Sequence, residues 1–419
     1  MQRRTSRWLT VGALAAAGTL VLTGCGSGFS ETPEPGAGGA GDLTSSDDAL
    51  TILIGTSGDA ETAAVKDAVS AWSESSGTDA EVKVASDLTQ ELSQGFSSGK
   101  PADVFYLSTE ALPGYAANGS VLAYGDLLEN KDDFYPSLVS SFTYEGDFYC
   151  APKDFSSLAL QINTDMWAEA GLTDDDIPTT WEELETVSKA LTTPEHVGLA
   201  IGAEYQRIGA FMAQAGGNLM NDDSTEATAN SPENVEALTF VQKMLNDGTL
   251  KYVKDVGAGW GGEAFGKGLS AMTIEGNWIT GAMTNDFPDV NYTVAELPEG
   301  PAGKGTMQFS NCWGIATDSP NQQAAFDLIQ ELTTAESQLA FSEAFGPLPS
   351  IQSAAEDWKA AHETLVPYLN GVEYAKSVPT IQGTSDVMTD LNSKLEGLKT
   401  GDPKAILDSA QSNIEALLK

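Results

Sequence analysis

The chain has 419 residues, of which 41% are hydrophobic, and it carries 60 acidic against 21 basic side chains. The formal net charge of −39 repels the phosphates of nucleic acids and anionic lipids, so we expect the protein to bind neither directly. The apolar content and the eight tryptophans indicate a packed globular body rather than a disordered acidic chain.

The N-terminal segment predicts export. Three arginines precede an uncharged, apolar run over residues 8–22, which is too short to span a bilayer. The run ends in Leu22-Thr23-Gly24-Cys25, which resembles the bacterial lipobox, where the cysteine thiol receives a diacylglyceryl group. We expect removal of residues 1–24, lipidation of Cys25 and a protein held on the outer face of the cytoplasmic membrane. A plain secretory signal is the alternative, and the paired arginines leave both general and twin-arginine export open.

A linker follows the lipidation site. Residues 26–48 are rich in glycine, serine and proline, and such a segment buries too little apolar surface to order itself. We predict a flexible linker over residues 25–49 and regular structure from Leu50 onward. The remaining chain of about 400 residues is long enough for about two domains.

Strand and helix patterns alternate after the linker. The predicted strands are residues 50–54, 81–84, 103–107 and 158–162. Between the first two, Val65, Val69 and Trp72 recur at the spacing of one helical face. This alternation favours an α/β class with a parallel sheet.

Later helices are marked by their N-terminal signals. The predicted signals are Thr180–Glu183, Ser231–Pro232, Ser319–Pro320 and Asp402–Pro403. The first has the pattern of a capping box, and the others place a capping side chain before a proline at the first helical position.

Catalytic and metal-binding motifs are sparse in the sequence. It has two histidines, no His-Glu-x-x-His pattern and no phosphate-binding glycine loop. The acidic runs 174–176 and 221–223 lack the calcium-loop pattern, so we interpret them as solvated loops. We therefore expect no metal, no cofactor and no catalysis. A glycosidase needs only two carboxylates, so a surface glycan hydrolase stays open as the alternative.

The three cysteines leave a pair once Cys25 is assigned to lipidation. Cys150 and Cys312 would then be the two remaining cysteines in an oxidising compartment, and they are a candidate disulfide. Spacing alone leaves two options open, a disulfide and two buried free thiols.

Five segments, taken in order, resemble the sugar-type solute-binding proteins of bacterial ABC importers, the maltose-binding-protein-like family. They lie within residues 100–119, 146–167, 178–184, 264–278 and 313–350. The resemblance implies a two-lobed, type II periplasmic-binding-protein-like α/β fold with a hinge and a ligand cleft between the lobes. It implies lobe 1 over residues 50–153 plus 311–374 and lobe 2 over residues 154–310 plus 375–419.

The same resemblance implies a function. The protein would capture a sugar outside the cell, as a monomer, and deliver it to the membrane subunits of an ABC permease. A binding protein for a non-sugar polar solute is the second alternative. The resemblance also implies that Cys150 and Cys312 lie near the lobe junction, and on that ground we predict that they form a disulfide.

Sugars present hydroxyl groups and apolar faces, so their sites use acidic, amide and aromatic side chains. Trp278 matches a position that carries a ligand-stacking tryptophan in maltose-type proteins, and we predict that it stacks on the ligand. Glu275 and Asn277 lie on the same turn and are predicted hydroxyl partners. A core tryptophan, and solvated or capping roles for the other two, are the alternatives.

Further candidates follow the ends of predicted strands or match the family's contact positions. They are Ser57, Gly58, Asp59, Ser108, Glu110, Asp154, Glu204, Tyr205, Gln206, Trp260 and Trp313. Alternative roles are helix capping for Asp59 and packing at the hinge for Trp313. Leu107 stands where maltose-type relatives can carry an aromatic residue, and residues 378–382 contain no tryptophan. We therefore expect a mono- or disaccharide, or a polyol-like solute, rather than a long stacked oligosaccharide.

Overall fold

The computed structural model describes residues 43–56, 58–221 and 223–419. The predicted signal segment, Cys25, most of the predicted linker and Ser57 lie outside the described residues. Within the described part of the chain, no helix is both long and apolar enough to cross a lipid bilayer.

The first sheet has five strands in the order β2-β1-β3-β13-β6. They are β1 (Leu50–Ile54), β2 (Ala80–Val84), β3 (Val104–Ser108), β6 (Ala151–Pro152) and β13 (Asn311–Ile315). Strand β1 pairs in parallel with β2 and β3, whereas β13 is antiparallel to β3 and β6. Helix α1 (Asp59–Ser76) follows β1 and buries Val65, Val69 and Trp72, the face that the sequence predicts.

The second sheet has seven strands, with β14-β12-β7-β10-β8-β9 in order and β11 paired to β7. They are β7 (Ser156–Asn163), β8 (Val197–Ile201), β9 (Leu250–Tyr252), β10 (Ser270–Gly276), β11 (Tyr292–Ala295), β12 (Thr306–Phe309) and β14 (Ala375–Lys376). Strands β9 and β10 run parallel to β8, and β7 is antiparallel to β10, β11 and β12.

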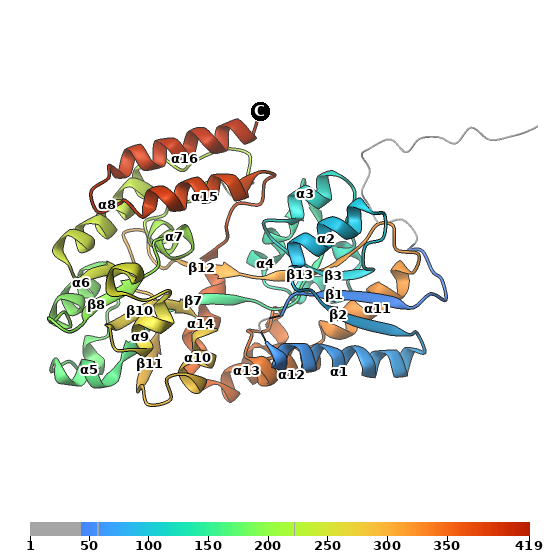
Figure 1. Ribbon diagram of the computed structural model, residues 1–419, viewed down its shortest axis with the longest axis horizontal. Coiled ribbons are helices and arrows are strands. Elements are labelled where there is room, and N and C mark those ends of the chain that lie inside the picture. Colours follow the sequence, from blue (N-terminus) through green and yellow to red (C-terminus); the bar gives the residue numbers. More distant parts are fainter. Residues whose placement is uncertain (1–42, 57, 222) are drawn as a thin grey trace, which may run out of the picture. The chain divides into compact units, whose positions relative to one another are not determined.

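Helices surround both sheets (Figure 1). Besides α1 they are α2 (Leu88–Ser97), α3 (Leu112–Ala117), α4 (Pro136–Ser141), α5 (Thr164–Glu169), α6 (Trp181–Ala190), α7 (Tyr205–Gln214), α8 (Pro232–Asp247), α9 (Gly261–Gly266), α10 (Ile279–Asn285), α11 (Gln322–Leu332), α12 (Ala335–Phe345), α13 (Ala355–Ala361), α14 (Val366–Asn370), α15 (Thr384–Leu395) and α16 (Pro403–Leu417). A short hairpin of β4 (Thr143–Tyr144) and β5 (Asp147–Phe148) precedes β6.

Two strands connect the sheets. Figure 1 shows β7 and β12 running between the part built on the five-stranded sheet, here called lobe 1, and the part built on the seven-stranded sheet, here called lobe 2. They pair with each other through Gln308–Ser157 and Phe309–Ser156. Both lobes belong to one compact unit.

Each sheet has its own apolar core. The core of lobe 1 contains Ile52 and Phe105, and the core of lobe 2 contains Leu160 and Ile274. A third cluster joins residues from both predicted lobes, namely Leu138, Phe155, Ala159, Leu348, Trp358, Tyr368, Leu369 and Val372. Because this cluster spans the predicted division, the exact lobe boundaries stay a prediction.

The helix signals are confirmed in part. Ser231 and Asp402 cap α8 and α16 as predicted. Thr180 accepts a hydrogen bond from the amide of Glu183, but the Glu183 carboxylate binds the amide of Thr179 instead of closing the capping box. The prediction for Ser319 is wrong: its hydroxyl donates to Asp103, and α11 begins three residues later, at Gln322.

Hydrogen-bonded structure extends before Leu50. The amide of Thr44 donates to Oε1 of Gln322 over 3.1 Å, and its hydroxyl donates to the carbonyl of Ser319 over 2.9 Å. The carbonyl of Asp48 accepts from Nδ2 of Asn321. The last residues of the predicted linker are therefore bound to the start of α11.

Candidate functional site

The sheet topology gathers the candidate residues at two edges. In lobe 1 the strands β1, β3 and β6 run in the same direction, with β13 between β3 and β6. Ser108 is the last residue of β3, and Asp59 and Asp154 come shortly after β1 and β6. In lobe 2 the ends of β8 and β10 are followed by Glu204 and Trp278. Ligands of open α/β sheets bind outside the carboxyl ends of strands, so both groups stand where a ligand site is expected.

A buried charge cluster lies at the lobe 1 edge. Nζ of Lys153 lies 3.2 Å from Oε1 of Glu61 and also contacts the carboxylate of Asp154. The hydroxyl of Tyr106 donates to Glu61 over 3.1 Å, and Nζ of Lys153 lies 4.6 Å from the Tyr106 ring centroid. Two carboxylates therefore share one ammonium group.

Burial and the neighbouring charges both act on the pKa values of this cluster. Burial raises the pKa of Asp154, although Lys153 acts in the opposite direction. Burial alone would lower the pKa of Lys153, but Asp154, Tyr106 and Glu61 outweigh burial and raise it. Lys153 therefore stays charged and lies beside two carboxyl groups.

Trp313 lies behind the same cluster. Its ring is 1% exposed and meets the Tyr106 ring edge-on, with the ring centroids 4.8 Å apart. The Trp313 carbonyl accepts a hydrogen bond from Tyr124, while its Nε1 has no partner among the described residues. The ring thus packs in lobe 1 and presents no open face to a ligand in this structure.

A second charge cluster lies at the lobe 2 edge. The Arg207 guanidinium lies 2.6 Å from Oε2 of Glu275 and 3.4 Å from Oε1 of Glu204. Glu275 is 1% exposed, and burial raises the pKa of this carboxyl against the opposing effect of Arg207. As in lobe 1, two carboxylates share one cation.

Trp278 is fixed against this second cluster and yet remains accessible. Its Nε1 donates to Oε2 of Glu275 over 3.0 Å, and the Arg207 guanidinium carbon lies 5.3 Å from the ring centroid. The ring is 38% exposed and is the one aromatic side chain among the exposed large hydrophobic residues of the described chain. A Cβ on Gly276 would approach the ring to 2.1 Å, so the glycine makes this ring position possible.

Asn277 links the two lobes. Its Nδ2 donates to the carbonyl of Gly346, which ends α12 in lobe 1, over 2.8 Å. The residue is 6% exposed, and its Oδ1 has no partner in the described part of the chain. Since Nδ2 faces a carbonyl, Oδ1 must be the acceptor that is left over.

The remaining candidates are less concentrated. Tyr205 is 1% exposed and its amide donates to Asn392, so its ring belongs to the lobe 2 core. Trp260 is half-buried over Gly262, and Gln206 has a buried Oε1 without a described partner. Gly58, Asp59 and Glu110 are exposed, and Ser108 accepts from the amide of Ala111.

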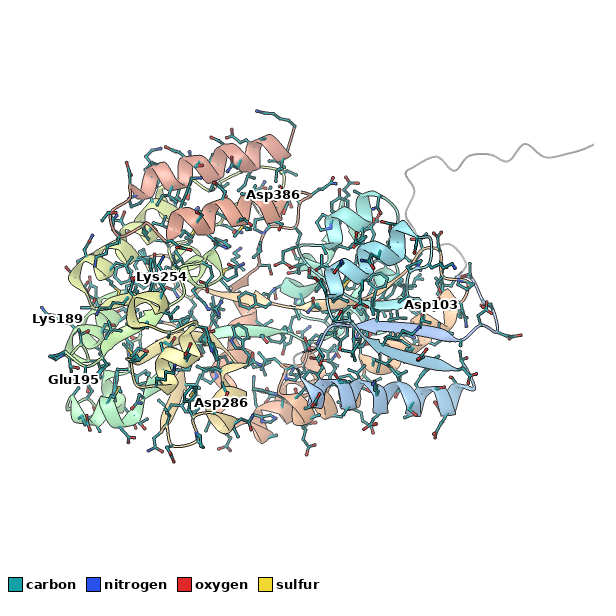
Figure 2. All side chains as sticks on the ribbon, in the orientation of Figure 1. Asp103, Lys189, Glu195, Lys254, Asp286 and Asp386 are labelled. Atoms are coloured by element: carbon teal, nitrogen blue, oxygen red, sulfur yellow. A yellow bond between two sulfur atoms is a disulfide. The ribbon has the colours of Figure 1, made fainter. Side chains whose placement is uncertain are left out.

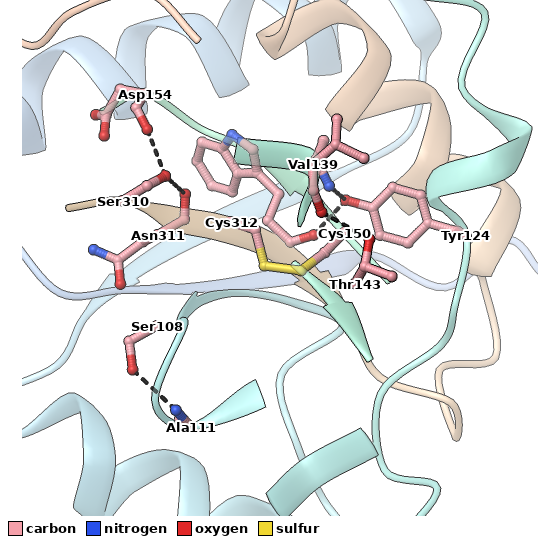
Figure 3. The surroundings of a disulfide bond; sticks show 12 residues. Ser108, Ala111, Tyr124, Val139, Thr143, Cys150, Asp154, Ser310, Asn311 and Cys312 are labelled. Atoms are coloured by element: carbon pink, nitrogen blue, oxygen red, sulfur yellow. Dashed lines mark hydrogen bonds between the residues drawn. A yellow bond between two sulfur atoms is a disulfide. The ribbon is translucent and has the colours of Figure 1, made fainter. Parts of the chain in front are cut away.

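The disulfide prediction is confirmed. Cys150 and Cys312 are bonded, with Cα atoms 5.6 Å apart and both residues fully buried. Figure 3 shows the bond beside Ser310, whose hydroxyl donates to the carbonyl of Asp154. Because Cys150 precedes β7 and Cys312 follows β12, the bond fastens the lobe 1 ends of both connecting strands.

A profile of the bacterial extracellular solute-binding proteins matches residues 69–366. The chain belongs to this family. Membership implies an exported protein, as the N-terminal segment predicts. A binding protein of Brucella abortus (strain 2308) is 23% identical over 345 residues, which cover 79% of this chain and 83% of that protein. The diacetylchitobiose binding protein DasA of Streptomyces coelicolor is 25% identical over 300 residues, or 68% of this chain and 70% of that protein.

Solved structures resemble this solute-binding protein in fold. The crystal structure of the cyclic alpha-maltosyl-1,6-maltose binding protein from Arthrobacter globiformis has a TM-score of 0.78, at 22% identity, and covers 88% of this chain and 98% of that chain. The predicted two-lobed fold class is thereby confirmed.

Several residues of the site were missed from the sequence. They are Glu61, Tyr106, Lys153 and Arg207. A compositional signal existed for one of them, because Arg207 is the only arginine after Arg7. The other pairings join distant positions, such as Lys153 and Glu61, which no local pattern predicts. Among the described residues no group of three or more histidine, cysteine, aspartate or glutamate side chains could hold a metal ion.

Proposed function

We propose that this solute-binding protein is a non-catalytic lipoprotein that captures a saccharide outside the cell and delivers it to an ABC permease. The exposed ring of Trp278 carries the proposal. Trp278 is 38% exposed and is held by Glu275 and Arg207, so the accessible part of its ring offers an apolar surface for the C–H face of a sugar.

The polar residues around the ring suit the hydroxyl groups of the same ligand. Oδ1 of Asn277 is buried and unpartnered, and Glu204 lies within the Arg207 cluster. Hydroxyl groups both donate and accept, so one sugar satisfies such mixed partners. Of the predicted contacts we propose Asp154, Glu204, Glu275, Asn277 and Trp278 as the core of the site. Ser57, Gly58, Asp59, Ser108, Glu110, Gln206 and Trp260 stay predicted contacts around it.

The ligand is proposed to lie between the two strand edges. Lobe closure would then bring Asp154 and Trp278 to opposite sides of one saccharide, and the closed state would be favoured by the ligand's extra contacts. The bond from Asn277 to Gly346 supports this arrangement, since it joins the turn after β10 to the end of α12 in lobe 1. We propose a mono- or disaccharide as ligand and a monomer as the working state.

Calorimetric titration of the mature protein with a saccharide panel tests the proposal. We expect saturable binding of a saccharide and no release of reducing sugar on long incubation. Turnover of a bound glycan would favour a surface hydrolase, and binding of only non-saccharide solutes would overturn the sugar assignment. The curated relatives reported above are binding proteins, which supports the non-catalytic assignment.

Anchoring is a separate part of the proposal and has its own test. A diacylated and further acylated cysteine carries enough chains for stable attachment, whereas one chain does not. We expect the full chain to fractionate with membranes and the Cys25→Ser variant to be released. A lipid-free Cys25 in the mature protein would contradict the anchor but not the receptor function.

A further inference from the structure

The cations beside the candidate contacts are already paired with carboxylates. Lys153 is shared by Glu61 and Asp154, and Arg207 is shared by Glu204 and Glu275. Each cluster therefore holds one more carboxyl group than it holds cations. An anionic ligand placed there would meet carboxylates without a free cation to bind it.

A third cation near Glu204 is paired as well. Lys254 lies along a small hollow of about 150 Å³ that Glu204 and Tyr252 also line. Its Nζ lies 2.5 Å from Oε2 of Glu396. An anion that entered this hollow would therefore find the Lys254 ammonium group already paired with Glu396.

Helix N-termini at these edges carry acidic side chains, although no side chain caps the N-terminal amides of α1 or α7. An anion is favoured at a helix N-terminus by the dipole and by unpaired N–H groups. The first turn of α1 holds Asp59 and Glu61, and Glu204 stands at the N-cap of α7. These carboxylates occupy the regions where a phosphate or carboxylate of a ligand would bind.

The unpartnered buried atoms favour hydroxyl groups. Among the described residues, Oδ1 of Asn277 and Nε of Arg207 have no hydrogen-bond partner; the first needs a donor and the second an acceptor. A hydroxyl group serves both needs, whereas an ammonium group can only donate, as Oδ1 of Asn277 requires, and an ionised phosphate can only accept. The two clusters are also connected, since Phe345 lies 5.6 Å from Nζ of Lys153 and the next residue, Gly346, binds Asn277.

From these observations we infer that the site selects its solute by charge: it takes uncharged or ammonium-bearing saccharides and excludes phosphorylated or carboxylated ones. Glu204 and Asp154 are the residues that exclude anions. They are the more exposed carboxylates of their clusters, with side chains 35% and 14% exposed against 1% for Glu275 and 5% for Glu61. This inference rests on the proposed function, because it concerns the same site.

Matched ligand series test the selection by isothermal calorimetry at low salt. The probes are glucose, glucosamine, glucuronate and glucose 6-phosphate, trehalose with trehalose 6-phosphate, and glycerol with glycerol 3-phosphate. In every series that binds, we expect the anionic member to bind at least about tenfold more weakly than its uncharged counterpart. An anionic member that binds as tightly as its uncharged counterpart overturns the inference.

The outcome for charge is distinct from the outcome for saccharides. Binding of glycerol in preference to glycerol 3-phosphate, with no sugar bound, would support the selection and contradict the saccharide receptor. Binding of glucose 6-phosphate in preference to glucose would contradict the charge selection and support the saccharide receptor.

Charge-neutralising variants test the two residues. We define the affinity ratio as the affinity for the uncharged member of a series divided by the affinity for its anionic member. Glu204→Gln and Asp154→Asn should each lower this ratio by about fivefold to tenfold. Glu195→Gln is the control, since it removes the same formal charge at the amino end of β8, far along the strand from Glu204, and Figure 2 places Glu195 at the outer margin of lobe 2. An unchanged ratio in both variants, with folding verified by thermal melting, overturns the assignment of these residues.

Discussion

Nδ2 of Asn277, in lobe 2, donates a 2.8 Å hydrogen bond to the carbonyl of Gly346, in lobe 1. One side chain on the turn that also carries Trp278 therefore links lobe 2 to the end of α12 in lobe 1. The bond makes Asn277 both a predicted ligand contact and a link between the lobes.

Asn277→Ala should shift the free protein toward a more open arrangement. A hydrogen bond contributes a net stabilisation of about 1 kcal/mol, so its loss should shift the equilibrium between the closed and open arrangements about fivefold toward the open one. Small-angle scattering without ligand should report a larger radius of gyration than for the parent protein. The control is Asn285→Ala, which removes a similar amide-to-carbonyl bond, to Gly281, that lies entirely within lobe 2. Equal radii for all three proteins would contradict a role in holding the lobes.

Trp278→Ala should weaken saccharide binding strongly and stability little. Loss of the stacking ring removes aromatic contact with the sugar, and a ring that is 38% exposed contributes less to the core than a buried one. We expect at least a tenfold rise in Kd by calorimetry, with partial recovery in Trp278→Phe. Leu418→Ala, at 39% exposure on the C-terminal side of α16, should leave Kd unchanged. A Kd unaffected by Trp278→Ala would remove this ring from the site.

Replacement of both cysteines by alanine should lower stability substantially. The disulfide closes a loop of 162 residues, for which the chain-entropy relation gives about 5 kcal/mol, and measured losses are about 2–5 kcal/mol. Urea unfolding of Cys150→Ala/Cys312→Ala should therefore have a clearly lower midpoint. Two free thiols in the non-reduced parent protein, found by mass mapping, would contradict the bond itself.

Glu296→Gln should destabilise the protein in a pH-dependent way. Burial alone would raise the pKa of Glu296, but hydrogen bonds from Lys304, Asn370 and Tyr374 outweigh burial and lower it below the usual 4.5. A carboxyl whose pKa is lowered by folding stabilises the folded state above its unfolded pKa, and this contribution is lost as the pH falls through the folded value.

The free energy of unfolding of Glu296→Gln should thus be about 1 kcal/mol lower than that of the parent protein at pH 7. The expected difference is modest because the carboxylate is 29% exposed. It should shrink as the pH is lowered below 4.5. Chemical denaturation at several pH values measures this difference. A difference that grows on acidification would show that the pKa is shifted in the other direction.

Much of the fold could be predicted because its strands are apolar runs. Strand β1 follows its predicted bounds, and β3 and β7 lie within one or two residues of theirs, since each is a buried stretch bounded by turn or polar residues. Strands such as β14, with two residues, exist only through tertiary pairing and carry no periodic signal. Ser319 failed as a cap because a distant carboxylate, Asp103, binds its hydroxyl.

The site was less predictable than the fold. Trp278 was found through its resemblance to a family position, and its exposure is consistent with that choice. The charge clusters depend on contacts such as Arg207 with Glu275, which are 68 residues apart in sequence. Burial of Tyr205 could not be seen from its local sequence, since it follows β8 in the same way as exposed candidates follow their strands, and Trp313 is buried because it lies within the central strand β13.

Calorimetric titration of the mature protein with uncharged mono- and disaccharides, combined with an assay for released sugar, tests the central claim most directly. The receptor assignment predicts saturable binding at one site per chain, weakened by Trp278→Ala, with no product formed. Binding confined to non-saccharide solutes, or turnover of the bound glycan, would contradict it.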